Sequence, residues 1–170
     1  GTPLTTEVAE IAGWTYDNTK IHKTPWFDAG QDEVTKTILA VKVACLDITA
    51  NETVQVEIAY DYLEGAADAS YKILGTISGT GTAGNGTTTF LIAADGAVAR
   101  KITPAGTITE TPNPTGNDFT SVRIKLTLVR SSTNTLSPNV VRVTLVYRKK
   151  LPIRYTHTFK VDLSGEYNGR

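Results

Sequence analysis

The sequence is poor in the residues that form disulfides, metal sites and nucleophilic centres. Among 170 residues it has one cysteine, two histidines and no methionine. A single cysteine excludes an internal disulfide framework. Cys45 lies in the apolar run Ile38–Ile48 with no histidine near it in the sequence. We therefore expect a buried structural thiol and not a nucleophile.

Long hydrophobic runs and helical periodicity are also lacking. No apolar run reaches the length of a membrane span, and no signal peptide opens the chain. Because the chain has no methionine, even at its first residue, we expect it to be a processed product or an excised piece of a longer protein. Apolar residues rarely recur at the three- and four-residue spacing of an amphipathic helix. This absence excludes helical bundles and favours an all-β fold.

Alternation of apolar and polar residues is the strongest pattern present. It predicts two long paired strands at Ser121–Arg130 and Val140–Tyr147, and a hairpin formed by Thr35–Ile48 and Thr53–Leu63. Each of these strands would bury one face. The core-facing residues expected in Thr35–Ile48 are Leu39, Val41 and Val43. Those expected in the two long strands are Val122, Ile124, Leu126 and Leu128, and Val141, Val143, Leu145 and Tyr147.

Shorter elements complete the prediction. Tyr71–Ile77 is expected to be a strand, and Thr103–Asp118, rich in Pro, Gly, Thr and Asn, a long surface loop. The other expected elements are a strand starting at Trp14–Tyr16, a short hairpin of Phe90–Ala94 with Ala97–Ile102, and a closing strand at Tyr155–Leu163.

These elements together predict an antiparallel β-sandwich of the jelly-roll type with about eight to ten strands. We expect residues 14–163 to form this single domain. Residues 1–13 would be an N-terminal arm or linker. Residues 164–170 would be a C-terminal tail or a linker to a further domain.

Charge is unevenly distributed along the chain although its formal net value is zero. Residues 121–170 contain 10 Lys or Arg and 2 Asp or Glu, a balance of +8, whereas residues 1–120 contain 7 and 15, a balance of −8. Pairing of acidic and basic strands within one sheet would explain this. A bipolar surface on which copies stack head to tail is the alternative.

Motifs for catalysis are absent. Gly79–Gly84 matches G-x-G-x-x-G, but the Asn-Gly-Thr residues that follow are poor helix formers and no βαβ unit surrounds them. His22 and His157 have no second metal ligand close in sequence. No nucleophile, base and orienting group can be assigned. We expect no enzymatic activity, no cofactor and no metal site.

Two groups of residues could bind partners. Trp14, Tyr16 and Trp26 could stack on sugar rings if they are exposed, or cap the core if they are not. Arg148, Lys149 and Lys150, with Arg154 nearby, form a basic cluster. No aromatic interleaving or nucleic-acid-binding fold accompanies this cluster, so we expect no contact with nucleic acid. The cluster would be a solvated corner, or a contact with a protein partner such as a salt-bridged joint to a further domain.

The order of several landmarks resembles that of a known group of proteins. The landmarks are Pro25–Gly30, a hairpin ending in Val54–Asp61, Tyr71–Gly75 before a Gly/Thr loop, Asp118–Leu128, Ser137–Val141, Pro152–Tyr155 and Phe159–Leu163. In this order they resemble β-sandwich domains of tailed-bacteriophage tail or baseplate proteins. They are also similar to the wider class of discoidin and carbohydrate-binding modules.

The resemblance implies a structural module of a phage virion, located in the virion after assembly in the host cytoplasm. Its implied partners are other virion subunits, including copies of itself, with host attachment as a further role. It transfers no catalytic residue, because the matching positions are scaffold. The alternative is a carbohydrate-binding module that recognises a cell-surface glycan through exposed aromatic residues, with an extracellular location.

Overall fold

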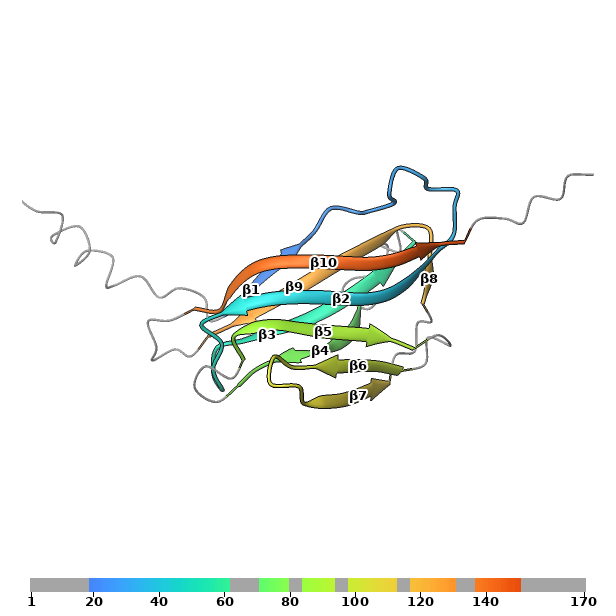
Figure 1. Ribbon diagram of the computed structural model, residues 1–170. Coiled ribbons are helices and arrows are strands. Elements are labelled where there is room, and N and C mark those ends of the chain that lie inside the picture. Colours follow the sequence, from blue (N-terminus) through green and yellow to red (C-terminus); the bar gives the residue numbers. More distant parts are fainter. Residues whose placement is uncertain are drawn as a thin grey trace, which may run out of the picture.

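The computed structural model describes residues 19–61, 71–79, 84–93, 98–112, 117–130 and 137–150. These residues form ten β-strands and no helix (Figure 1). The strands are β1 (Thr19–Lys23), β2 (Lys36–Leu46), β3 (Thr53–Tyr60), β4 (Lys72–Ile77), β5 (Gly86–Ile92), β6 (Val98–Ile102), β7 (Ile108–Pro112), β8 (Asp118–Phe119), β9 (Val122–Val129) and β10 (Asn139–Lys149). All the strand pairs are antiparallel.

Two sheets face each other across one hydrophobic core. The four-stranded sheet has the order β1-β9-β3-β4, and the six-stranded sheet has the order β10-β2-β5-β6-β7, with β8 pairing the start of β2. Figure 1 shows the six-stranded sheet in front of the four-stranded one. The all-β class, the antiparallel β-sandwich and the expected number of strands are confirmed.

The core comes from the period-two positions of the central strands. Its fully buried members include Val41, Val43, Val56, Ile58 and Phe90. The expected alternation in Ser121–Arg130 is confirmed, because Val122, Ile124 and Leu126 are buried against this core. Burial of this apolar surface is the main force that holds the two sheets together.

The predicted hairpin of Thr35–Ile48 with Thr53–Leu63 is wrong. Its first strand, β2, lies in the six-stranded sheet and its second, β3, in the four-stranded sheet. Ile48, in the connection between them, is fully buried in the core. The connection therefore passes over the end of the core and carries the chain from one sheet to the other.

The predicted pairing of Ser121–Arg130 with Val140–Tyr147 is wrong for the same reason. β9 pairs with β1 and β3, whereas β10 pairs with β2 in the other sheet. The alternating pattern identified a buried face on each strand. It carries no information about which strand lies alongside.

Two core residues were also assigned wrongly. Leu39 and Val141 are exposed, and each lies at a register shift in the β10–β2 pairing. An extra residue at a β-bulge leaves the ladder and interrupts the strict alternation. Val140 packs against the core in the place expected for Val141.

The remaining predictions have mixed outcomes. β4 and the pairing of β5 with β6 confirm the short strand and the short hairpin. The expected loop Thr103–Asp118 instead contains β7 and begins β8. The strand β1 was not predicted as such. The expected strands at Trp14–Tyr16 and Tyr155–Leu163 lie outside the described residues, as do the expected arm, 1–13, and tail, 164–170.

Candidate functional site: a groove between the sheet edges

A groove runs along one side of the sandwich, between β1 and β10. β1 is an edge strand of the four-stranded sheet, and β10 is an edge strand of the six-stranded sheet. Within the described residues, neither strand has a partner on its outer side. The two hollows that form the groove lie between these edges and have volumes of about 850 Å³ and 500 Å³.

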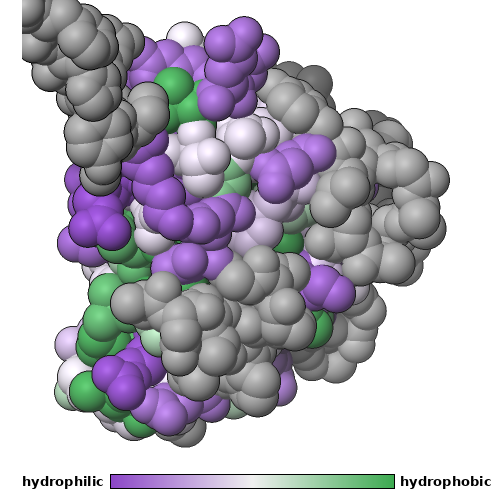
Figure 2. Space-filling model, turned by 90° about the vertical axis from the view of Figure 1, so that its right-hand side faces the viewer, coloured by the Kyte–Doolittle hydropathy of each residue, from purple (hydrophilic) through white to green (hydrophobic). Residues whose placement is uncertain are grey.

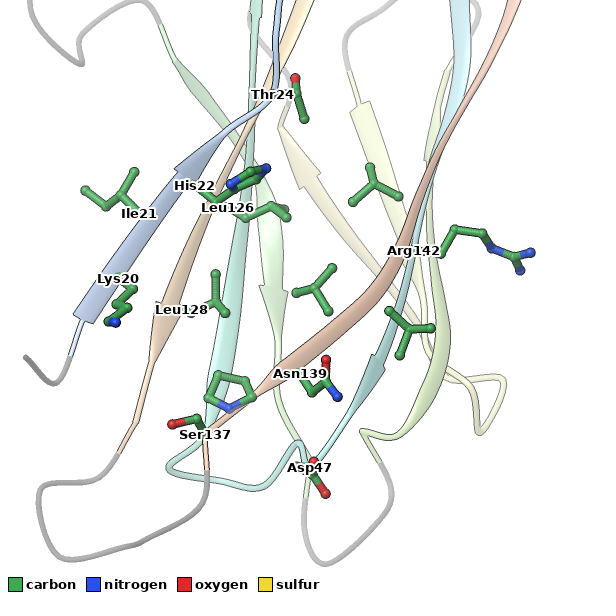
Figure 3. Close-up of a pocket in the computed structure, with 14 residues that line it drawn as sticks. Lys20, Ile21, His22, Thr24, Asp47, Leu126, Leu128, Ser137, Asn139 and Arg142 are labelled. Carbon is green, nitrogen blue, oxygen red and sulfur yellow. The ribbon is translucent and has the colours of Figure 1, made fainter. Parts of the chain in front are cut away.

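The larger hollow lies where β1 and β10 begin and β9 ends (Figure 3). Lys20 and His22 of β1 line it beside Leu128 and Leu126, their cross-strand partners on β9. Cross-strand partners share a face of the sheet, so two polar residues of β1 occupy core-facing positions. The sandwich is therefore open to solvent at this side instead of being sealed by apolar side chains.

The opposite wall of the larger hollow comes from the start of β10. Val140 and Val143 line it and are partly buried against the core. Val141 at the bulge also lines it and is 61% exposed. Arg142 extends away from β1 in Figure 3. The hollow thus has an apolar floor and charged residues around it, namely Lys20, Arg142 and Asp47.

The smaller hollow continues the groove toward the other end of the sandwich. Residues 24–27, which follow β1, form one wall, and Leu145 of β10 contributes to the other. Phe27 is exposed and contacts the ring of Tyr147 edge-on, with 5.6 Å between the ring centroids. This second hollow is lined mainly by apolar and aromatic side chains.

Trp26 is the one predicted sugar-binding aromatic that the described residues contain. It is half-buried, lines the smaller hollow, and has the guanidinium carbon of Arg123 5.8 Å from its ring centroid. Arg123 is held in turn, because its Nε donates a 2.6 Å hydrogen bond to the carbonyl oxygen of Thr24. Trp14 and Tyr16 lie outside the described residues.

The predicted basic cluster lies at the end of β10. Arg148, Lys149 and Lys150 are exposed, and Arg154 lies outside the described residues. Figure 2 shows this end of the sandwich, where hydrophilic residues cover much of the coloured surface. Lys150 Nζ lies 2.5 Å from Asp118 Oδ2, and its hydrogen bond is the main reason that the pKa of Asp118 is lowered. One cation of the cluster is therefore paired.

Opposite charges from the two parts of the chain meet inside the sandwich as well as on its surface. Lys125 of β9 and Glu57 of β3 are directly opposed, with 3.0 Å between Nζ and Oε2, and both side chains are almost fully buried. Lys125 Nζ also lies 4.8 Å from the ring centroid of Tyr71. These pairs support the interpretation that the uneven charge is in part balanced between neighbouring strands.

The expected structural thiol is confirmed. Cys45 is buried in the core, and burial raises its pKa to about 11. Among the described residues, no group of three potential metal-ligating side chains comes together. In the same part of the chain, no helix has the length and hydropathy that a membrane-spanning helix requires.

The groove could not be predicted from the sequence, because β1 is a short strand of mostly polar residues. Its sequence, TKIHK, alternates in the sense opposite to that of a buried strand, with Ile21 exposed and Lys20 and His22 toward the core side. Polar residues at core-facing positions of an edge strand are a signal of an open sandwich. These residues can be recognised as core-facing only when the position of the facing sheet is known.

Comparisons with protein-family models, with curated proteins and with solved structures found no match to this chain.

Proposed function

We propose that this chain is a non-enzymatic structural module of a phage virion that assembles with other subunits through the groove between β1 and β10. The observation that carries the proposal is a pair of sheet edges that have no further strand beside them in the described part of the chain, on either side of a hollow of about 850 Å³ with an apolar floor. Unpaired edges accept further strands, and natural proteins usually cover or blunt them. The order of sequence landmarks that resembles phage tail and baseplate domains supports the virion context.

The charge on β10 supports a binding role over simple protection of the edge. Arg142, Arg148 and Lys149 are exposed along this strand. Charges on an edge discourage non-specific pairing with other sheets. They also select a partner with acidic residues at matching positions.

A light-scattering measurement of molar mass against protein concentration tests the proposal. We expect self-association that weakens in Val141→Asp, which places a negative charge in the larger hollow. Ile108→Asp is the matched control, because Ile108 is 60% exposed and lies on β7, the opposite edge strand of the same sheet. A monomer at all concentrations that binds no neighbouring virion subunit would refute the proposal.

The second candidate function is carbohydrate binding at the smaller hollow. The position of Trp26 beside the exposed Phe27 favours it, because aromatic faces with nearby polar groups stack on sugar rings. A glycan array followed by titration of tryptophan fluorescence tests this candidate, with Trp26→Ala as the control. If the array shows no binding and Trp26→Ala changes nothing, the candidate is excluded.

A further inference from the structure

The groove has a direction that one extended segment could follow, because the same two strands line both of its hollows or lead into them. The start of β1 and the start of β10 line the larger hollow together, and residues 24–27 and Leu145 line the smaller one. β1 and β10 therefore run in the same direction on the two sides of the groove. A strand that is antiparallel to β10 is then also antiparallel to β1, and could donate and accept hydrogen bonds along either edge.

Residues 155–163 have the sequence pattern of such a strand. The segment reads YTHTFKVDL, in which mainly apolar and aromatic residues alternate with polar ones. One side carries Tyr155, His157, Phe159, Val161 and Leu163, and the other carries two threonines, a lysine and an aspartate. Nine residues in extended conformation span about 30 Å. β10, with 11 residues, offers an edge of comparable length.

The charges of the segment and of β10 match in an antiparallel register. A register that places Asp162 beside Arg142 also places Lys160 beside Thr144 and Thr156 beside Arg148. Asp162 then lies opposite the cation of Arg142, and Lys160 lies opposite an uncharged residue. Opposite charges directly across two strands stabilise the pair, whereas like charges destabilise it.

The connection between β10 and this segment favours donation to another copy. The backbone N–H of Lys150 donates to the carbonyl oxygen of Thr35, and its Nζ pairs with Asp118, so the chain still follows β2 at residue 150. Residues 151–154, LPIR, contain no Gly, Asn or Asp, the residues that tight reversals favour. Pro152 also biases Leu151 toward an extended conformation. A connection that resists reversal promotes strand exchange between copies.

We propose that residues 155–163 of one copy fill the groove between β1 and β10 of a second copy. The apolar side of the segment covers the floor of the two hollows, and its polar side lies outward beside Thr144. This inference rests on the proposed function and names the partner of the same groove. Each copy both donates and accepts a strand, so the copies form either a reciprocal dimer or a head-to-tail series.

Disulfide trapping between two single-cysteine variants of the full chain tests the donation directly. One copy carries Thr144→Cys, and the other carries Thr156→Cys, Thr158→Cys or Lys160→Cys. Native Cys45 does not interfere, because it is buried and its pKa is raised to about 11. Each variant therefore carries Cys45 and one introduced cysteine. After mixing, dissociation at low concentration, reassociation and addition of a mild oxidant, we expect a disulfide between the introduced cysteines of the two variants. Ile108→Cys replaces Thr144→Cys as the control and should give none.

A double variant with cysteines at positions 144 and 160 of one chain distinguishes the two routes. A cross-link only within single chains, with none between mixed copies, would overturn donation to a second copy. Absence of any cross-link at all three positions would overturn occupancy of the groove by this segment.

Phe159→Asp gives an independent readout of the same contact. We expect the concentration for half-association to rise about tenfold or more, because an aromatic anchor is replaced by a charge. Thr158→Asp, on the opposite side of the segment, should change it by less than about threefold. If Val141→Asp dissociates the protein but Phe159→Asp does not, the groove remains an assembly site and residues 155–163 are not its occupant.

Discussion

Replacement of the fully buried Lys36 by methionine should destabilise the sandwich strongly. Lys36 is the first residue of β2, and its Nζ donates hydrogen bonds to the carbonyl oxygens of Gln31, Val34 and Thr120 at 2.5, 2.8 and 2.8 Å. These bonds tie the loop before β2 to the segment between β8 and β9. The ammonium also lies 5.9 Å from the ring centroid of Phe119. One side chain thus joins three segments at one end of the core.

The expected magnitude follows from these bonds. A hydrogen bond to a charged group contributes about 1.5–3 kcal/mol, so three of them set an upper limit of about 9 kcal/mol. Two effects lower that limit. The carbonyl oxygen of Gln31 also accepts from the N–H of Val34, and methionine avoids the cost of burying an ammonium. We expect Lys36→Met to reduce the free energy of unfolding by about 3 kcal/mol.

Urea unfolding followed by fluorescence and circular dichroism measures this loss. The control is Lys42→Met on the same strand, because Lys42 is exposed and its replacement should change the free energy of unfolding by less than about 0.5 kcal/mol. A shift in the midpoint without a change in slope would show that stability alone has changed. A loss below about 1 kcal/mol for Lys36→Met would refute the reasoning, because the three carbonyl contacts together would then contribute less than one hydrogen bond to a charged group usually does.

Three further predictions concern ionisable groups. Glu57→Gln should lower the free energy of unfolding, measured with urea, by about 3 kcal/mol, because it leaves the ammonium of Lys125 buried without its carboxylate. Replacement of both residues by leucine should restore much of this loss. Cys45 should resist a thiol reagent at pH 8 until the protein is unfolded, because a pKa of about 11 leaves about one thiol in a thousand ionised. Asp118→Asn should lower stability at pH 7 by at most about 1 kcal/mol, since the Asp118–Lys150 pair is half exposed.

The pH dependence of the Asp118 effect has a definite sign. The folded pKa of Asp118 lies below the usual pKa of an aspartate, so its contribution is present at neutral pH and is lost as the pH falls through that lowered pKa. The stabilities of the wild type and Asp118→Asn should therefore converge in strong acid. If the two stabilities converged at high pH instead, the result would contradict a lowered pKa of Asp118 in the folded protein. For Cys45, stoichiometric labelling of the native protein within minutes would contradict the prediction. For Glu57, the contradicting result would be a double variant that is less stable than either single replacement.

The candidate site was only partly predictable. Trp26 and the cations of β10 were selected from residue type and pattern, and the structure places Trp26 at the smaller hollow and Arg148 and Lys149 on an exposed edge. The larger hollow was not predicted, because Lys20 and His22 come from a strand whose pattern is polar. Its other wall depends on a bulge at Val141, where one extra residue interrupts the alternation.

The all-β class could be predicted from residue patterns alone, as could the approximate number of strands and most of their buried faces. Period-two alternation is a local property, and a strand with one apolar face must bury it whatever its neighbours are. Which strands are neighbours depends on how the two sheets pack in three dimensions. Ile48, between β2 and β3, is buried in the core, and these two strands belong to different sheets. β9 and β10 also belong to different sheets. The groove exists because the strands are divided between two sheets in a way that leaves β1 and β10 as facing edges. Such a pair of edges depends on both sheets, so the pattern of a single strand cannot predict it.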